Sequence, residues 1–415
     1  MVKSIYNLLT SLLAPTLSIA GLFNKKLKLG NAGRAKAFEI LSNKLTKGAK
    51  TAWFHCASLG EFEQGLPVFE KIVADNQFDQ IVLTFFSPSG YEIKKNITWA
   101  TAVVYLPLDT FENAEKFVAL VQPTLSVFVK YEIWPNYLTQ LSKINAKTIL
   151  ISANFRVNQI YFKSYGKFLL TALKTFTHIF VQEETSKIIL NSFNINQVTI
   201  SGDTRFDRVS AQLNSDNTIA IIEDFISKDL CVVAGSTWPK DEEFLIPFIN
   251  EVGKKHVKFI IAPHEIDKSH INKIENSLKV PYSKYSLIAE SEAVESNVLI
   301  LDTIGILSKV YSYADIAIVG GASGNSGLHN TLEAAVFGIP IGIGKNFSKF
   351  PEANAMIKEG GMFYFSTAKE LKYQLNKLIQ SEEKRTQMGL LNAAHVRKNK
   401  GAVIQIHSFI RAVLR

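Results

Sequence analysis

The alternation of short apolar runs with amphipathic segments of helix length is the feature that most constrains the fold of this chain. Strand-like runs rich in β-branched and aromatic residues lie at 52–56, 80–86, 102–106, 124–129, 147–152, 178–181 and 197–200. Helix-length amphipathic segments lie between most of them, for example at 61–75, 111–121 and 158–175. Strands that alternate with helices form βαβ units, so we predict a parallel sheet covered by helices.

The alternation occurs twice. A polar segment without a strand pattern, at 208–228, interrupts it, and strand-like runs then resume at 230–234, 258–262, 298–301, 315–319, 339–343 and 362–365. With 415 residues, the chain also exceeds the size of a single hydrophobic core. We predict an α/β protein with two doubly wound parallel-sheet domains that face each other across a cleft. The first domain is predicted at 25–218 and the second at 219–415, with a helical tail from about residue 368.

The N-terminal segment has a different character. Residues 5–23 contain no charged side chain, and lysines follow from Lys25 onward. A bilayer core requires about 20 apolar residues, and Pro15 makes this segment a poor spanning helix. A signal peptide is disfavoured because the basic flank comes after the apolar stretch. We predict that residues 1–24 anchor the chain at the cytoplasmic side of a membrane, either in the interface or barely spanning it; the alternative is a first helix buried in the domain.

The formal net charge of +9 fits an anionic partner. The sequence shows no zinc-finger spacing, no RNP-like aromatic cluster and no long Lys/Arg run, which argues against nucleic acid. A membrane surface or a phosphorylated lipid remains, beside the alternative of a merely lysine-rich soluble surface. Cys56 and Cys231 lie in apolar strand-like runs, so we predict that both are reduced core residues.

Two carboxylates follow predicted strands of the first half, where ligands of doubly wound sheets bind. HCASLGE (55–61) puts Glu61 in the first turn of the next helix, where the helix macrodipole favours the ionised form by about 0.3–1 kcal/mol. Glu61 is therefore either a general base or a simple helix-start residue. KYEIWPN (130–136) contains Glu132, and the sequence does not decide between a sugar-site carboxylate and an ordinary residue at a strand end.

The segment GGASGNSGLHNTLEAAVFGIP (320–340) is a glycine-rich turn between a predicted strand and a helix expected to begin near His329. Free backbone N–H groups and the helix dipole at such a turn favour a phosphate. Asn330 and Glu333 would share one helix face and could reach the phosphate and a pair of ribose hydroxyls. The Walker and GxGxxG spacings are absent, so the pattern does not identify the nucleotide.

A metal site is not expected. His264, Glu265 and His270 form the pattern HExxxxH, which does not place both histidines on one helix face. His264 is better suited to contact the oxygens of a nucleotide or a sugar acid.

Seven segments together resemble the transferases of 3-deoxy-D-manno-octulosonic acid (Kdo) in lipopolysaccharide synthesis. They are HCASLGE (55–61), SPSG (87–90), YEIWPN (131–136), SGDTRFDR (201–208), AGSTW (234–238), DTIGIL (302–307) and GLHNTLEAA (327–335). The resemblance covers nearly the whole chain, and the apolar N-terminus belongs to the same pattern. It implies a GT-B fold and inverting transfer of Kdo from CMP-Kdo to a tetraacylated lipid A precursor (lipid IVA), without metal or cofactor, at the cytoplasmic face of the inner membrane.

The resemblance also implies roles for individual residues. Glu61 matches the general base that deprotonates the acceptor hydroxyl, Glu132 matches a carboxylate that stabilises the transition state, and Arg205 stands where the family usually has a lysine of similar role. The segments that contact CMP are matched by Pro263, His264, Gly305, Ile306, Leu307, Asn330, Thr331, Leu332 and Glu333. Besides Arg205, two further departures are His264, where many members have arginine, and Lys130, which replaces a usual glutamate.

Two other functions stay open at this point. One is a GT-B glycosyltransferase of envelope synthesis that uses a UDP-sugar, since a glycine-rich loop would serve UDP equally well. The other is a non-catalytic, membrane-associated nucleotide-binding protein.

Overall fold

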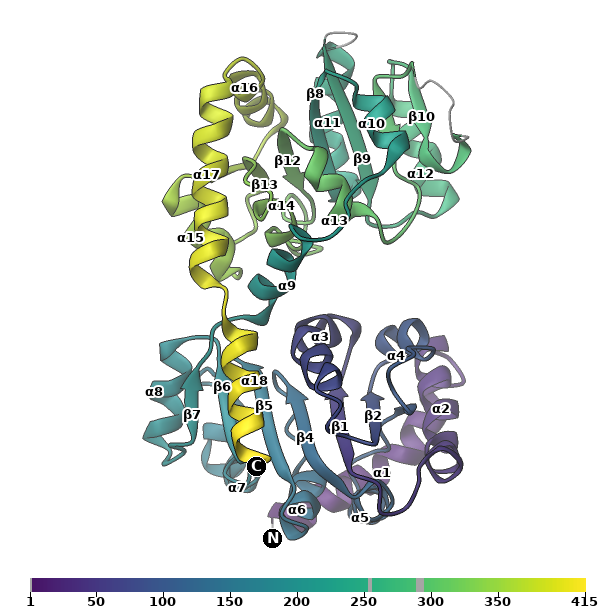
Figure 1. Cartoon of the computed structure of the whole chain (residues 1–415). Coiled ribbons are helices and arrows are strands. Elements are labelled where there is room, and N and C mark those ends of the chain that lie inside the picture. Colours follow the sequence, from purple (N-terminus) through teal and green to yellow (C-terminus); the bar gives the residue numbers. More distant parts are fainter. Residues whose placement is uncertain (1, 253–255, 289–294) are drawn as a thin grey trace. The chain divides into compact units, whose positions relative to one another are not determined.

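The computed structural model describes residues 2–252, 256–288 and 295–415. The chain divides into two compact units, Met1–Arg208 with Lys400–Arg415, and Val209–Asn399. Each unit contains one sheet, and both are drawn in Figure 1. The units are described separately below.

The first unit contains a parallel sheet with the strand order β3-β2-β1-β4-β5-β6-β7. Its strands are β1 (Thr51–Cys56), β2 (Gln80–Phe85), β3 (Ala102–Tyr105), β4 (Pro123–Val129), β5 (Lys147–Ala153), β6 (His178–Val181) and β7 (Val198–Ile200). Its helices are α1 (Val2–Ala20), α2 (Lys25–Lys44), α3 (Leu59–Ala74), α4 (Pro88–Lys94), α5 (Phe111–Val121), α6 (Pro135–Lys143), α7 (Lys167–Leu173), α8 (Glu184–Ser192) and α18 (Ala402–Val413). The chain crosses between the units through α9 (Thr204–Gln212).

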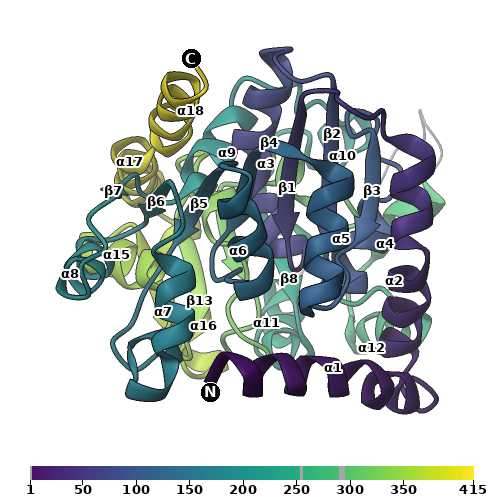
Figure 2. The same ribbon diagram turned by 90° about the horizontal axis from the view of Figure 1, so that it is seen from below.

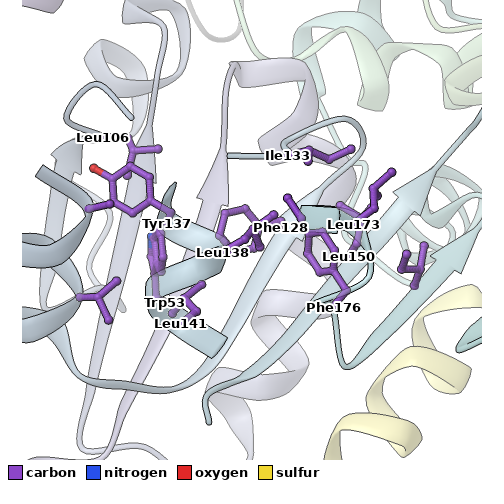
Figure 3. Packing of buried hydrophobic residues seen from close by; sticks show 14 of the residues in the cluster. Trp53, Leu106, Phe128, Ile133, Tyr137, Leu138, Leu141, Leu150, Leu173 and Phe176 are labelled. Atoms are coloured by element: carbon purple, nitrogen blue, oxygen red, sulfur yellow. The ribbon is translucent and has the colours of Figure 1, made fainter. Parts of the chain in front are cut away.

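The two faces of this sheet are buried under different helices. Side chains of α2, α5, α6 and α7 cover one face around Trp53, and Figure 2 shows α5, α6 and α7 on that side of the strands. Figure 3 shows how Trp53, Phe128 and Tyr137 pack there. Side chains of α3 and α18 cover the other face. Because both faces are buried, the strands read as nearly continuous apolar runs, as the sequence predicted.

The second unit also contains a parallel sheet, in the order β10-β11-β9-β8-β12-β13-β14. Its strands are β8 (Leu230–Thr237), β9 (Val257–Pro263), β10 (Tyr282–Lys284), β11 (Val298–Ile300), β12 (Ile316–Val319), β13 (Ile341–Gly344) and β14 (Met362–Phe365). Its helices are α10 (Ala220–Ile226), α11 (Pro239–Val252), α12 (Lys268–Ser277), α13 (Leu307–Val310), α14 (Leu332–Ala335), α15 (Pro351–Glu359), α16 (Ala368–Ile379) and α17 (Glu382–Asn399). One face of the sheet packs against α11, α12 and α16.

The prediction of two doubly wound parallel-sheet domains is confirmed, and so is the burial of Cys56 and Cys231 as free thiols. The short edge strand β10 was missed because it has only three residues and no strand-like pattern. The helix predicted at 158–175 is broken into two 3₁₀ turns and α7. A Cβ on Gly166 would lie on the carbonyl oxygen of Ile160, so the chain turns tightly there.

The predicted boundaries differ from those of the compact units. The prediction divided the chain at 218/219 and gave all of 219–415 to the second domain, whereas residues 400–415 pack in the first unit. The carboxylate of Asp207 accepts hydrogen bonds from the backbone N–H groups of Gly401 and Ala402 at the start of α18. The apolar side of α18 then joins the core beneath α3. This long-range packing has no local signal in the sequence.

The N-terminal helix α1 turns its polar side toward the first unit. Tyr6 Oη donates to Asp109 Oδ2 over 2.8 Å, and Asn136 Nδ2 donates to Asn7 Oδ1 over 3.0 Å. Six large apolar side chains of α1 remain between 44% and 62% exposed, namely Ile5, Leu8, Leu9, Leu12, Leu13 and Ile19. The alternative of a helix whose apolar side is buried in the domain therefore does not hold.

Within the described part of the chain, no helix is both long enough and apolar enough to cross a bilayer.

Candidate active site

The two predicted carboxylates of the first unit lie at the point where its strand order reverses. The sheet begins with β1 at its centre and continues outward on one side through β2, then on the other from β4. The chain after β1 carries Glu61 and the chain after β4 carries Glu132. Because both strands are parallel neighbours, their carboxyl ends meet at the switch point, where doubly wound sheets bind ligands.

Glu61 lies at the start of α3 and caps it. Its Oε2 accepts a hydrogen bond from the backbone N–H of Ala57 over 2.5 Å. Burial and the neighbouring Glu132 raise the pKa of Glu61 to about 7, against the opposing effects of the backbone N–H groups and Lys130. The helix start was expected to favour the ionised form, but burial outweighs that effect. The result is a carboxyl group that exchanges its proton near neutral pH, as a general base requires.

Glu132 is held by two donors. Its Oε2 lies 2.9 Å from His55 Nε2 and accepts from Trp134 Nε1 over 2.7 Å. The residue is 9% exposed, so its carboxylate has been largely removed from water. Lys130, just before it, has a left-handed backbone with φ 61°, a conformation that costs a lysine roughly 1–2 kcal/mol. Such strain at the end of a central strand is common at functional sites.

Arg205 lies at the start of α9. Its Nε donates to Asp203 Oδ2 over 2.8 Å, and its NH2 group is 2.7 Å from the same oxygen. The preceding Thr204 donates to the backbone carbonyl of Gln64 on α3, within one helical turn of Glu61. Asp203 therefore fixes the orientation of the guanidinium, and Thr204 fixes α9 against the helix that carries Glu61.

We expect Glu61→Gln to stabilise the fold above neutral pH. A raised folded-state pKa means that stability is complete below the unfolded value of 4.5 and is lost as the pH rises through about 7. Glutamine keeps the shape but does not ionise, so this loss, on the order of 1–3 kcal/mol, should disappear. Thermal denaturation should give a higher Tm for the variant at pH 8 and nearly equal values at pH 5. A gap of the same size at both pH values would contradict the assignment.

The predicted donor residues of the second unit also lie at one edge of its sheet. Pro263 ends β9, Gly305 to Leu307 follow β11, and the glycine-rich segment follows β12. Gly305 has φ 100°, which favours glycine in this turn. In the strand order, β11, β9, β8 and β12 are neighbours, so these segments meet at the carboxyl ends of adjacent strands.

Three aromatic rings cluster at the switch point of this sheet. The ring of His264 stacks on Trp238 with centroids 4.8 Å apart and lies 4.3 Å from the ring of His329. Trp238 Nε1 donates to His329 Nε2 over 2.8 Å, so this nitrogen carries no proton. Burial and the neighbouring His264 lower the pKa of His329 to about 4. His264 packs on the uncharged rings of Trp238 and His329 and is itself exposed, so it can meet a ligand.

The glycine-rich loop differs from its predicted form. The backbone N–H of Gly321 donates to Asp241 Oδ2 over 2.8 Å and is not free for a phosphate. A Cβ on Gly320 would collide with the backbone of Ser236, so this glycine serves close packing of the loop on β8. The helix begins at Leu332, not near His329, and α14 has only four residues. The predicted contribution of a helix dipole is therefore small.

Asn330 precedes α14, so Asn330 and Glu333 do not share a helix face as predicted, but their side chains nevertheless meet. Asn330 Nδ2 donates to Glu333 Oε1 over 3.0 Å, and Asn330 Oδ1 accepts from the backbone N–H of Leu332. Thr331 is buried, and its hydroxyl oxygen has no hydrogen-bond partner. The charge of Glu333 contributes to a raised pKa of the buried Tyr311, after the larger effect of burial. The Thr331 hydroxyl at this edge thus has unused hydrogen-bonding capacity.

In the stretches 2–252, 256–288 and 295–415, no three His, Cys, Asp or Glu side chains form a group that could hold a metal ion.

Comparison with known proteins identifies the relatives of this chain. Residues 31–208 match the family described as 3-deoxy-D-manno-octulosonic-acid transferase (kdotransferase). The Kdo transferase of Haemophilus influenzae is 26% identical over 377 residues, which cover 87% of each chain. That of Aquifex aeolicus is 29% identical over 355 residues, which cover 82% of this chain and 91% of the other. The chain is a homologue of the Kdo transferases. Its relatives are thus transferases of 3-deoxy-D-manno-octulosonic acid.

The fold has a wider distribution. UDP-GlcNAc 2-epimerase from Neisseria meningitidis, solved with bound UDP-GlcNAc, superposes with a TM-score of 0.62 at 15% sequence identity. The match covers 87% of this chain and 100% of the epimerase. It shows the same GT-B fold of two doubly wound domains.

Sequence reasoning missed several residues of these sites. It singled out Glu132 but not its partner His55, and His264 but not the rings of Trp238 and His329 beside it. His55 and Trp238 lie inside the segments HCASLGE and GSTW, so proximity to a strand end was an available signal. Asp241 lies on α11 and gave no signal, because its contact with the glycine-rich loop spans 80 residues.

Proposed function

We propose that this chain transfers Kdo from CMP-Kdo to a tetraacylated lipid A precursor by an inverting, metal-independent reaction. The observation that carries the proposal is the pair of Glu61 and Glu132 at the switch point of the first sheet, in a homologue of the Kdo transferases. A Glu61 that titrates near pH 7 suits proton abstraction from a sugar hydroxyl.

In this reaction the bond from the anomeric carbon of Kdo to the CMP phosphate breaks, and its electron pair leaves with the phosphate oxygen. The acceptor hydroxyl oxygen bonds to that carbon from the opposite face, and its proton passes to Glu61. The charges of Glu132 and Arg205 act on the cationic sugar and the anionic groups of the donor as the charge shifts. The second unit holds CMP, with Glu333 accepting from ribose hydroxyls and His264 contacting donor oxygens.

The decisive assay incubates purified protein with CMP-Kdo, generated in situ, and tetraacylated lipid A precursor, in the presence of excess EDTA. A product heavier by Kdo, detected by mass spectrometry, is expected. Parallel reactions with UDP-sugars test the UDP-dependent alternative. CMP binding without turnover of any donor would favour a non-catalytic nucleotide-binding protein, and activity restored only by Mg²⁺ or Mn²⁺ would overturn metal independence.

We further propose that α1 attaches the protein to the cytoplasmic face of the inner membrane. Its apolar side chains are exposed while its polar side contacts Asp109 and Asn136, the reverse of a helix that packs on a core. Exposed lysines, beginning at Lys25, follow at the start of α2 and suit an anionic lipid surface.

Replacing Leu8, Leu9 and Leu12 by serine should move the protein from the membrane fraction to the soluble fraction. These side chains are exposed, so the change removes membrane contacts without opening a cavity. Flotation with vesicles of anionic phospholipid measures the loss, and calorimetric titration should show unchanged CMP affinity. Retained flotation would contradict attachment through α1. Serine at Ile188 and Ile404, exposed apolar residues on other helices, provides the matched control.

A further inference from the structure

The first unit buries a histidine completely beside the candidate carboxylate Glu132. His55 lies in β1 and is 0% exposed. Its Nε2 is 2.9 Å from Glu132 Oε2, and its Nδ1 is 2.8 Å from Thr84 Oγ1 on β2. A β-branched apolar residue would fill a central strand position without needing polar partners. The histidine therefore calls for an explanation beyond the packing of the sheet.

The hydrogen bonds around Thr84 determine which ring nitrogen carries the proton. Trp53 Nε1, which can only donate, donates to Thr84 Oγ1 over 2.9 Å. The single hydroxyl proton of Thr84 has two possible acceptors, His55 Nδ1 at 2.8 Å and the carbonyl oxygen of Phe54 at 3.4 Å. The shorter bond is favoured, so we assign Nδ1 as the acceptor. In a neutral ring the proton then lies on Nε2 and points to Glu132.

The single proton of Trp134 Nε1 also has two possible acceptors, Glu132 Oε2 at 2.7 Å and His55 Nε2 at 3.1 Å, and the shorter bond to the carboxylate is favoured. Glu132 Oε2 then has two donors, His55 Nε2 and Trp134 Nε1. Hydrogen bonds to a carboxylate stabilise its charged form, and they matter more where water is excluded. The charge of Glu132 raises the pKa of Glu61, because like charges in one site oppose each other's ionisation.

We propose that His55 is a positioning residue that orients Glu132, so that the charge of Glu132 controls when Glu61 loses its proton. The inference rests on the proposed role of Glu61 as the base. It assigns a positioning role to three hydrogen-bonded residues, Trp53, Thr84 and His55. None of them belongs to the proposed pair of Glu61 and Glu132.

The other ionisable groups near Glu61 do not raise its pKa in place of Glu132. Lys130 opposes the effect of Glu132, as do the backbone N–H groups at the start of α3. Cys56 and Tyr131 also lie within electrostatic reach of Glu61. Burial raises the pKa of both, so they stay neutral near pH 7 and contribute no charge.

The test compares His55→Asn with His55→Gln. Asparagine places its amide near the position of Nδ1, so it can contact Thr84 but does not reach Glu132. Glutamine extends to the position of Nε2 and can still donate to Glu132. Glu132→Gln serves as the reference, because it shows how far the Glu61 titration midpoint moves when the charge of Glu132 is removed completely. The readouts are the ¹³C NMR titration of the Glu61 carboxyl group in the full chain without substrate, and the pH profile of kcat.

We expect the midpoint of the Glu61 titration to move to lower pH in Glu132→Gln and in His55→Asn, and to stay near the wild-type value in His55→Gln. The acid limb of the kcat profile should move in the same way. In wild type, ¹⁵N spectra should show the proton of His55 on Nε2. A folded His55→Asn variant with an unchanged Glu61 midpoint, or a proton on Nδ1, would overturn the proposal.

Two further observations keep the test decisive. If His55→Asn does not fold, Trp134→Phe removes the other donor from a partly exposed position, and an unchanged Glu61 midpoint there would count against control through Glu132. The NMR titrations need no turnover. Absence of Kdo transfer combined with the expected NMR shifts would refute the proposed function and leave the role of His55 standing.

Discussion

Glu61→Gln is expected to lower kcat by about 10²–10⁴-fold, the usual contribution of a general base. Glutamine keeps the side chain's shape and can still accept from the backbone N–H of Ala57, so the start of α3 should stay intact. Only the ability to take a proton is lost. Initial rates of Kdo transfer at saturating donor and acceptor measure the effect. CMP affinity should hardly change, because the residues proposed to bind CMP lie in the second unit.

The pH dependence of kcat tests the same role of Glu61. A base works in its ionised form, so kcat of the wild-type protein should fall as the pH drops through about 7. Glu63→Gln is the matched control, because Glu63 lies on the same helix and pairs with Arg208 at 2.9 Å. More than a tenth of wild-type kcat in Glu61→Gln would move the role of base to Glu132.

The sequence predicted the elements of this site better than their electrostatics. The period of the apolar runs located the strands, and the rule that ligands bind at carboxyl ends singled out Glu61 and Glu132. The ionisation of Glu61 was estimated from the helix dipole, a local effect. Its actual pKa depends first on burial and then on a carboxylate 71 positions along the chain, neither of which has a local pattern.

Contacts between distant segments were beyond sequence reasoning for a general reason. His55 meets Glu132 because β1 and β4 are neighbours, although two strands lie between them in the sequence. The return of α18 to the first unit depends similarly on Asp207 at its start and on apolar packing against α3. Periodicity identifies an element and its buried side but not the partner that buries it.

The glycine-rich loop illustrates how a motif can be located correctly and explained incorrectly. Its glycines were interpreted as a source of free N–H groups. In the structure, Gly321 donates to Asp241 and Gly320 allows close approach of β8. We therefore expect recognition of the proposed donor to depend less on the backbone of the loop and more on the side chains that follow it, Asn330 and Glu333.

Glu333→Ala should accordingly weaken CMP binding by about 1–3 kcal/mol, the typical contribution of a hydrogen bond to a charged group. This corresponds to a Kd about 5–150-fold higher, since every 1.4 kcal/mol is a factor of ten. In the present structure, Glu333 Oε1 accepts from Asn330 Nδ2, which orients the carboxylate beside the loop. Alanine removes the charge that would accept hydrogen bonds from the ribose hydroxyl pair.

Calorimetric titration with CMP measures the change. Glu251→Ala is a suitable control, because Glu251 is exposed near the end of α11 and pairs with Lys372 at the surface, where a salt bridge contributes about 0–1 kcal/mol. UMP should bind more weakly than CMP to the wild-type protein if the donor is a CMP-sugar. Equal affinities for CMP and UMP would remove the basis for that donor, whereas unchanged CMP affinity in Glu333→Ala would show that the ribose is held by other residues of this edge.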